Sequence, residues 1–382
     1  MHANRSFVAA AAVLAAGSAA IAGDILQKKD GSFSPAIKGT EAVQADYDAS
    51  NTQVVDANVN EVKILITVGG KQMAQTQPSS GVIEIHMEPR DFPGHWKPAV
   101  EAYKAGDYRT AAATFKDIGT DDKVNAVVRQ KALLFAARSV REGGTPAQAE
   151  AAYAELLKAF PQSFYTSKAY KDQSQMWMDA GDGAKARSYA EALLKLPGVS
   201  ESDQLEARFL QNTVNLREAA TKKDAAGIQK ALEAYKALAQ ETAGKKDSAG
   251  VNQLARIGMG NCLLEQGNPA EAKGIFSEIS ERANEDAVTA AAFNGLGDCW
   301  FREGNFAESR RCFLRTATIY AEGTPGDQVA RALYHSGVCF SKLQDSEDWK
   351  DRARRELNEC IRRFPKSSWA ELAKRALQSI GK

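Results

Sequence analysis

The sequence lacks the motifs on which most enzymes depend. It contains four histidines in 382 residues, and none belongs to an HExxH pair. It has no P-loop, no GxSxG nucleophile elbow and no Rossmann glycine fingerprint. It also has no CxxC pair and no cysteine–histidine spacing typical of a metal site. We therefore expect a protein that is not an enzyme and that holds no metal and no cofactor.

The chain also lacks a surplus of charge of either sign. Its 49 Lys and Arg residues and 48 Asp and Glu residues give a formal net charge of +1. Binding to nucleic acid generally requires a basic surplus, so this balance argues against it. The hydrophobic content of 44% and the charged content of 25% are ordinary for a folded, soluble protein.

Long apolar runs are absent beyond the N-terminus. Residues 1–22 have the features of a signal peptide, because Arg5 precedes an apolar core from Phe7 to Ala16 and Ala20-Ile21-Ala22 fits a cleavage site. The alternative is an N-terminal membrane helix, for which the apolar core is short. No cysteine follows Ala22. We expect an exported protein, periplasmic or secreted, that is soluble, is not a lipoprotein and has no membrane span in its mature chain.

Cysteine is missing from the first two thirds of the chain. The cysteines are odd in number, and three of them stand two residues after a glycine. A free, buried cysteine behaves as a small apolar residue, so this repeated position favours core packing over disulfide bonds or metal binding. The five are Cys262, Cys299, Cys312, Cys339 and Cys360.

Residues 23–90 differ in character from the rest of the chain. Short β-branched runs at 53–57, 61–68 and 82–86 are separated by turns rich in Gly, Pro and Ser. Apolar residues alternate along the second run, which is typical of a half-buried strand. We expect a small β-rich module here. Its turns and strand runs resemble those of small SH3-like barrels in secreted bacterial proteins.

Over residues 92–382, one pattern of apolar residues recurs seven times. A small residue is followed four positions later by another buried residue, usually large, and then by a third three positions on. Helical neighbours lie three and four residues apart, so each set is one buried helix stripe. Successive sets are 37–45 residues apart, which predicts a solenoid of stacked helical hairpins. The sets are Ala111/Phe115/Ile118, Ala149/Tyr153/Leu156, Ala186/Ala190/Leu193, Ala231/Tyr235/Leu238, Ala272/Phe276/Ile279, Ser309/Phe313/Thr316 and Ala353/Leu357/Cys360.

Glycines mark the turns inside these hairpins. Gly106, Gly181, Gly267 and Gly304 are each followed by Asp or Asn. A glycine can end the first helix in a left-handed conformation, and the Asp or Asn, including Asn268, is expected to cap the second helix.

The sixth unit has the clearest family signature. In order, it contains Phe293, Leu296, Gly297, Trp300, Gly304-Asn305-Phe306, Ser309 and Phe313. This pattern resembles a tetratricopeptide repeat. The resemblance covers residues 92–382 and implies a mainly α, right-handed solenoid of about seven helix hairpins plus a capping helix at Trp369. Proteins of this family bind other proteins.

Two second helices end in similar segments, Phe160-Pro161-Gln162-Ser163 and Phe364-Pro365-Lys366-Ser367. These endings are similar to those of bacterial periplasmic repeat proteins of the Tol–Pal coordinator and barrel-assembly type. The resemblance implies a non-enzymatic scaffold or adaptor in the cell envelope. The alternative is an envelope enzyme subunit, or a glycan- or ligand-binding protein that acts through the β-rich module.

The first helix of each unit is expected to line the inner surface, where a protein or peptide partner would bind. Basic residues predominate among the predicted partner-binding positions, so the partner is expected to be acidic. The alternative is that these are ordinary solvated side chains in a misassigned register. The positions are Lys131, Arg138, Arg141, Lys168, Lys171, Gln175, Asn261, Asn294, Asp298, Arg331 and Tyr334.

Overall fold

The computed structural model describes residues 25–28, 33–34, 52–68, 71–79, 82–86, 92–197, 199–245, 248–283, 286–321, 326–365 and 367–380. The predicted signal peptide at residues 1–22 lies outside these ranges.

The strands confirm the predicted β-rich module. One antiparallel sheet has the order β2 (Phe33–Ser34), β1 (Ile25–Lys28), β6 (Val82–His86). A second antiparallel sheet has the order β3 (Thr52–Ala57), β4 (Glu61–Val68), β5 (Lys71–Pro78).

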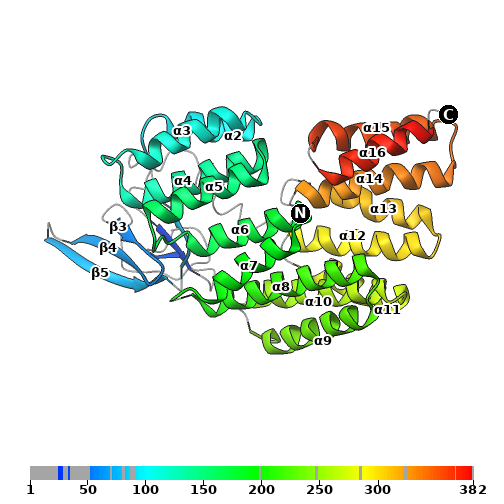
Figure 1. Ribbon diagram of the computed structural model, residues 1–382, viewed down its shortest axis with the longest axis horizontal. Coiled ribbons are helices and arrows are strands. Elements are labelled where there is room, and N and C mark those ends of the chain that lie inside the picture. The colour runs from blue at the N-terminus through cyan, green and yellow to red at the C-terminus, as the bar shows by residue number, and fades with distance from the viewer. Residues whose placement is uncertain are drawn as a thin grey trace. The chain divides into compact units, whose positions relative to one another are not determined.

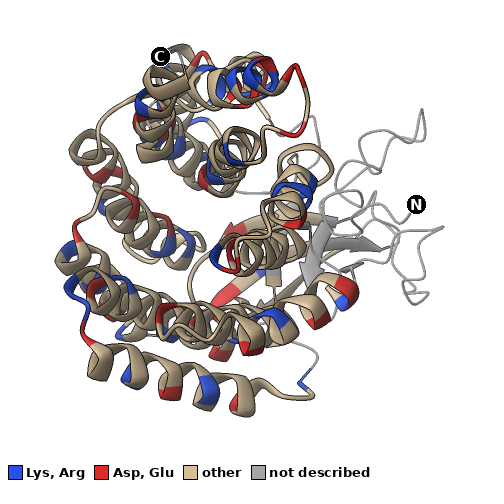
Figure 2. Cartoon of the chain, turned by 90° about the vertical axis from the view of Figure 1, so that its right-hand side faces the viewer, with Lys and Arg blue, Asp and Glu red and all other residues tan. Residues whose placement is uncertain are grey.

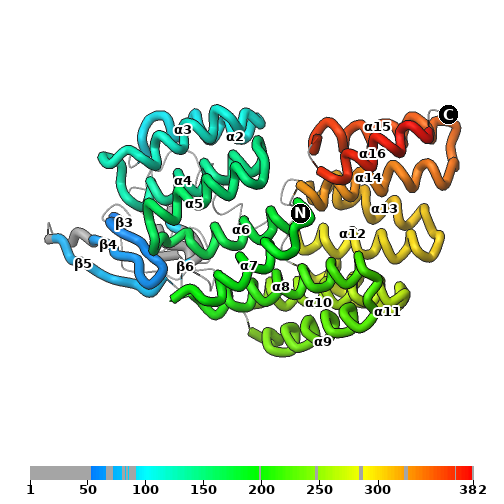
Figure 3. Tube along the Cα trace, viewed as in Figure 1, coloured from blue at the N-terminus to red at the C-terminus, as the bar shows by residue number. Residues whose placement is uncertain are grey.

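Fifteen helices follow in the described ranges, and they confirm the mainly α fold of seven consecutive pairs and a last helix (Figures 1 and 3). The first seven are α2 (Trp96–Lys104), α3 (Tyr108–Thr120), α4 (Ala126–Gly143), α5 (Pro146–Ala159), α6 (Thr166–Asp179), α7 (Gly183–Leu194) and α8 (Glu201–Lys222). The remaining eight are α9 (Ala225–Thr242), α10 (Ala249–Glu265), α11 (Pro269–Arg282), α12 (Asp286–Arg302), α13 (Phe306–Thr318), α14 (Gly326–Leu343), α15 (Trp349–Arg363) and α16 (Ser368–Ile380).

The described residues form two compact units, and the boundary between them in the sequence falls within α8, between Val214 and Asn215. The N-terminal unit contains the strands and α2 to α7. The C-terminal unit contains α9 to α16.

The seven predicted stripes are the buried faces of the second helices. All of their residues are buried, and none is more than 3% exposed. The large members Phe115, Tyr153, Phe276 and Phe313 are completely covered. The spacing of three and four residues therefore located the buried face of every second helix.

The hairpin turns also follow the prediction. Gly106, Gly181, Gly267 and Gly304 all have φ between 77° and 83°, the left-handed region that a glycine enters without strain. In three of the four turns, the side chain of the Asp or Asn that follows the glycine accepts a hydrogen bond from a backbone N–H. The prediction was wrong for Asn268, whose side chain makes no capping hydrogen bond. There, Pro269 begins the helix in the position where its missing N–H costs nothing.

The β3–β4–β5 sheet and helices α3 and α4 share one hydrophobic core. Val54, Val62 and Ile64 of the sheet pack in the same buried cluster as Phe115 of α3 and Val127 of α4. The module therefore covers apolar surface of the first hairpins. Its strands have too few residues to form a sufficient hydrophobic core alone, and the hairpins supply the rest of that core.

Gln130 of α4 fastens this contact with polar bonds. Its Nε2 donates to the Ala57 carbonyl at 3.0 Å. Its Oε1 accepts from Ser163 Oγ at 2.8 Å and from the Phe164 N–H at 3.0 Å. One buried side chain thus joins a strand, a first helix and the segment between two hairpins.

Large side chains of second helices lie against glycines of first helices. The ring of Phe276 on α11 packs between Gly260 of α10 and Gly295 of α12. A Cβ at either glycine would lie 2.5 Å from the ring, so neither position has room for a side chain. Gly297 meets Phe313 and Gly337 meets Leu357 in the same way.

We predict that Gly260→Ala lowers the free energy of unfolding by about 1–3 kcal/mol, because the methyl group forces the Phe276 ring to move. Gly274→Ala is the matched control, since Gly274 lies in α11 and a Cβ there would have nothing within 4 Å. It should raise stability by up to about 1 kcal/mol through its helix propensity. Chemical denaturation measures both, and equal effects would contradict the packing argument.

The cysteines confirm the predicted core packing. All five are buried and free, and none takes part in a disulfide bond. Burial raises the pKa of Cys262, Cys299 and Cys360 to about 12. It raises the pKa of Cys312 and Cys339 to about 11. The thiols are therefore both covered and protonated.

We predict that a thiol-reactive chromophore labels no cysteine of the native protein at pH 8, because the reactive thiolate is scarce and inaccessible. After denaturation, all five should react. Rapid labelling of even one thiol under native conditions would show that this core opens or that the cysteine is exposed.

Candidate partner-binding surfaces

The predicted partner-binding residues all lie on first helices. In the C-terminal unit, α10, α12, α14 and α16 contact one another in sequence order, and α4 contacts α6 in the N-terminal unit. First helices therefore form a layer of their own. Two neighbouring pairs carry most of the predicted residues. We call them the α4–α6 surface and the α12–α14 surface.

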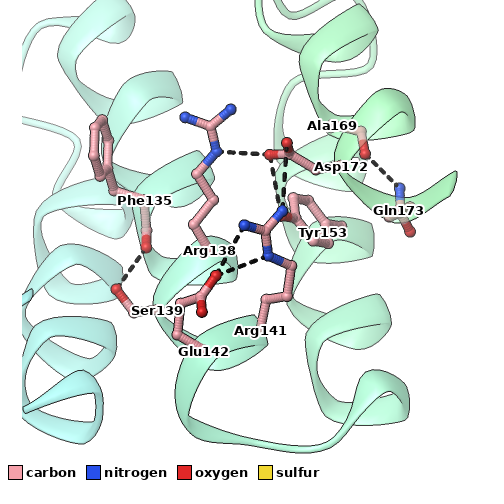
Figure 4. A network of polar contacts seen from close by, with 9 residues as sticks. All are labelled: Phe135, Arg138, Ser139, Arg141, Glu142, Tyr153, Ala169, Asp172 and Gln173. Atoms are coloured by element: carbon pink, nitrogen blue, oxygen red, sulfur yellow. Dashed lines mark hydrogen bonds and ion pairs between the residues drawn. The ribbon is translucent and has the colours of Figure 1, made fainter. Parts of the chain in front are cut away.

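The α4–α6 surface is organised around Asp172 of α6 (Figure 4). Its Oδ2 accepts from Arg138 Nε at 2.6 Å, and its Oδ1 lies 3.6 Å from Arg141 Nη1. Arg141 also pairs with Glu142 at 2.8 Å. The Tyr153 hydroxyl donates to Asp172 Oδ2 at 3.2 Å. One carboxylate thus gathers two arginines from α4 and a tyrosine from α5.

The electrostatics of the network keep Tyr153 as a donor. Burial, and after it the charge of Asp172, raise the pKa of the Tyr153 hydroxyl far above its usual range. The hydroxyl therefore stays protonated at every physiological pH. Together with Arg138 and Arg141, it fixes the position of the Asp172 carboxylate.

Arg138 keeps two hydrogen-bonding groups free. Its Nε is taken by Asp172, but neither Nη atom has a hydrogen-bond partner in the described part of the chain. Both Nη atoms point away from Asp172 in Figure 4. The side chain is 29% exposed, so this edge of the guanidinium is accessible.

Lys171 is neutralised within the chain. Its Nζ lies 2.9 Å from Asp203 Oδ1 and 2.7 Å from Glu206 Oε2, both on α8. Burial alone would lower the pKa of Lys171, but the two carboxylates outweigh it and raise the pKa. Lys171 is thus a charged anchor between α6 and α8.

The other predicted residues of this unit also have local contacts. Lys131 Nζ donates to the Ile85 carbonyl of β6 at 3.3 Å, which ties α4 to the β-rich module. Lys168 Nζ lies 5.3 Å from the ring centroid of Tyr165. Gln175 is exposed, and its amide donates to Asp179 at 2.8 Å.

On the α12–α14 surface, Asp298 and Arg331 form an ion pair that joins the two helices. Burial raises the pKa of Asp298, and the charge of Arg331 opposes that rise. The Arg331 guanidinium also lies 6.0 Å from the Trp369 ring centroid on α16. The predicted acidic and basic residues of this surface thus satisfy each other.

Asn294 lies deeper than a surface residue, at 1% exposure. Its Nδ2 donates to the Gln328 carbonyl of α14 at 3.1 Å. In the described ranges, its Oδ1 and the Oε1 of Gln328 are buried and accept no hydrogen bond. The side-chain oxygens of Asn294 and Gln328 are therefore left without hydrogen-bond donors in these ranges.

Aromatic rings fill the remainder of the surface. Tyr334 lies 5.7 Å from the Trp369 ring and 5.0 Å from His335. His335 stacks on Phe313 at 4.9 Å, and its Nδ1 is buried without a partner in the described ranges. Asn261 on α10 is half-buried, and no hydrogen bond in these ranges joins it to the other predicted residues.

Burial, and after it the charge of Arg331, lower the pKa of His335 to about 3. The unfolded chain, with an ordinary histidine pKa of about 6.5, takes up a proton first as the pH falls. This contribution to stability is therefore present above pH 6.5 and is lost as the pH falls towards 3.

We predict that the free energy of unfolding falls by about 2 kcal/mol between pH 7 and pH 5 because of His335. His335→Phe keeps an aromatic ring in the cluster and should remove most of this pH dependence. Denaturation midpoints of both proteins across this pH range measure the difference. Identical pH profiles would show that His335 is not buried in its neutral form.

Sequence reasoning missed the acidic partners Asp172, Asp203 and Glu206. A signal was present, because the ion pairs between first helices join residues 32–35 positions apart, about one repeat. Figure 2 shows Lys and Arg residues mixed with Asp and Glu residues over the helices. Pairing across repeats is what such mixing permits.

Metal-binding and membrane-spanning features are both missing from the described residues. In these ranges, no group of three or more His, Cys, Asp or Glu side chains could hold a metal ion. None of the helices described has the length and apolar character needed to cross a membrane.

Comparison with known families agrees with the repeat architecture. A tetratricopeptide repeat family model matches residues 331–367, which comprise most of α14 and all of α15. The match thus falls on the seventh hairpin, next to the sixth, where the signature residues are clearest. No curated protein matches the chain.

Similar solved structures have low sequence identity. A tetratricopeptide repeat protein from Parabacteroides merdae is 18% identical with a TM-score of 0.47, over 75% of this chain and 97% of that one. NprR in complex with its cognate peptide NprX is 12% identical with a TM-score of 0.43, over 75% and 82%. The type IV pilus biogenesis factor PilW is 17% identical with a TM-score of 0.37, over 64% and 97%.

Proposed function

We infer that this tetratricopeptide-repeat protein is a non-enzymatic scaffold that binds a segment of another protein on its first helices. One observation carries the proposal: Asp172 holds one edge of the Arg138 guanidinium, and the two Nη atoms of the other edge bond to nothing in the described part of the chain. A fixed arginine with free donors can bind a carboxylate through two parallel hydrogen bonds. The partner group at Arg138 is therefore a carboxylate.

This proposal narrows the expectation of a generally acidic partner. Lys171 and Arg331 already pair with carboxylates of this chain, so they offer little net charge to a partner. Arg138 differs because its Asp172 contact uses only Nε. We propose one carboxylate contact at Arg138, from an Asp or Glu side chain or from a chain end.

The α12–α14 surface suits a different part of an extended polypeptide. The Oδ1 of Asn294 and the Oε1 of Gln328 are buried, so a partner on this surface does not reach them. Tyr334 and the Trp369 ring, whose centroids lie 5.7 Å apart, offer aromatic faces for an apolar side chain. These rings suit a partner segment that carries an apolar residue at some distance from its carboxylate.

The proposed place of action is the cell envelope. Residues 1–22 have the charge, apolar core and small-residue end of a signal peptide. An exported scaffold, periplasmic or secreted, would meet its partner beyond the inner membrane. Fractionation of cells that express the full chain should place the protein outside the cytoplasm, and a purely cytoplasmic pool would refute this part of the proposal.

The partner-binding role is tested with Arg138→Lys. Lysine keeps the charge and can still reach Asp172, but it cannot present the two parallel donors. The partner is first identified by affinity purification and mass spectrometry with the wild-type protein, and its affinity is then measured by calorimetry. We expect at least a tenfold weaker affinity for Arg138→Lys, about 1.4 kcal/mol.

Arg310→Lys is the matched control, because Arg310 on α13 also pairs with a carboxylate, Asp345, at 3.2 Å. It should leave the affinity unchanged, since second helices are not the proposed surface. Thermal unfolding of both variants separates binding from stability. Wild-type affinity in a stably folded Arg138→Lys protein would show that Arg138 does not contact the partner.

A further inference from the structure

Strand β5 forms an open edge of the β3–β4–β5 sheet. It pairs with β4 over eight consecutive residues, from Lys71 with Val68 to Pro78 with Glu61, without a shift of register. In the described part of the chain, β4 is its only strand neighbour. The side chains from Gln72 to Thr76 are all exposed. Figure 1 shows β5 as the outer strand of its sheet.

Between its end residues Lys71 and Pro78, this edge has none of the features that usually prevent strands from pairing with other chains. Natural edge strands are commonly interrupted by charges, prolines or β-bulges. Residues Gln72 to Gln77 carry no charge, contain no proline and are paired without a bulge. The outer face of this strand is thus a regular row of backbone donors and acceptors.

The opposite edge of the same sheet shows the contrast. Strand β3 has a register shift between Val54 and Asp56, and Asp56 adds a charge. The Val54 carbonyl accepts from Asn125 Nδ2 of α4 at 3.3 Å, and the Ala57 carbonyl accepts from Gln130. Helix α4 therefore occupies the β3 edge, whereas among the described residues no strand besides β4 pairs with β5.

The sheet also extends beyond the helices that cover it. Gln75 pairs with Ile64 and Met73 pairs with Ile66, so Met73 and Gln75 lie on the face of the sheet that carries Ile64. Ile64 is 2% exposed, whereas Met73 is 52% exposed. An apolar side chain therefore stands uncovered beside the open backbone edge.

We propose that β5 pairs antiparallel with β5 of a second copy of this chain, which joins the two three-stranded sheets into one of six strands. The two copies are related by a twofold axis perpendicular to the sheet, the symmetry of a closed dimer. Two residues that face each other across this axis must lie on the same face of the sheet, so their numbers are both even or both odd. The pair of β5 strands is therefore centred on a single residue, either Ala74 or Gln75. An overlap of about six residues forms about six interstrand hydrogen bonds.

A second copy fits this edge because of its charge and its closure. No like charges from Gln72 to Gln77 would oppose each other, and uncharged amides would face uncharged side chains. The uncovered Met73 is buried next to Gln75 or Gln77 of the second copy. Growth stops at two copies because the β3 edge of each is already held by α4.

The test uses the purified protein and charged substitutions of Gln75. In either register, two Gln75 side chains lie directly opposite or diagonally across the same face, so Gln75→Lys and Gln75→Glu each place like charges together. Sedimentation equilibrium of the wild-type protein should give a mass that approaches twice that of one chain as concentration rises. Each variant alone should raise the dissociation constant of the dimer at least tenfold.

Mixing the two variants distinguishes self-pairing from any other effect. An equal mixture of Gln75→Lys and Gln75→Glu should restore the dimer, because a lysine then faces a glutamate. Gln378→Lys, an exposed change on α16, is the control and should dimerise like the wild-type protein. A wild-type protein that stays monomeric, or a Gln75→Lys variant that dimerises normally, would overturn the proposal. A failure of the mixture to recover would also overturn it, and circular dichroism of each variant confirms that it is folded.

Discussion

The close approach of large side chains to glycine is the constraint on which the helical units depend. Phe276 lies between Gly260 and Gly295, one on each neighbouring first helix, and Phe313 lies against Gly297. Such contacts bring backbones close together and bury the whole ring, which contributes the largest apolar areas in the core. They also fix the spacing and rotation of the first helices. The other face of each first helix is consequently left for polar and aromatic side chains.

Ion pairs between neighbouring first helices use that free face. Arg138 with Asp172, Lys171 with Asp203 and Asp298 with Arg331 each join positions about one repeat apart. Most charged side chains on this layer therefore pair with one another within the protein. These ion pairs also set the register between neighbouring hairpins. A partner then meets the groups that remain, which are the free edge of Arg138 and the aromatic faces of Tyr334 and Trp369. The groups available to a partner are therefore those that the internal ion pairs do not use.

The sequence was informative where the determining interactions are local. The stripes of small and large residues follow from helix geometry alone, and the left-handed glycines follow from the turn they occupy, so both were predicted correctly. Asn268 was not, because its cap depends on a side-chain rotamer and Pro269 already begins that helix. The partners of Lys171 and the burial of Asn294 depend on contacts between hairpins, which a single helix pattern does not contain. The shared core of the sheet and α3 and α4 was missed for the same reason.

The ends of stacked repeats need a cover, and the two units provide different ones. In the C-terminal unit, α16 buries Ala370, Ala373 and Ile380 against the last hairpin. In the N-terminal unit, the sheet covers the first hairpins, and Gln130 adds the hydrogen bonds that hold it there. A helix used as a cover satisfies its own backbone, whereas a sheet always has two edges. The helices occupy one of these edges at β3, and in the described part of the chain the choice of a sheet as cover leaves β5 with β4 as its only strand neighbour.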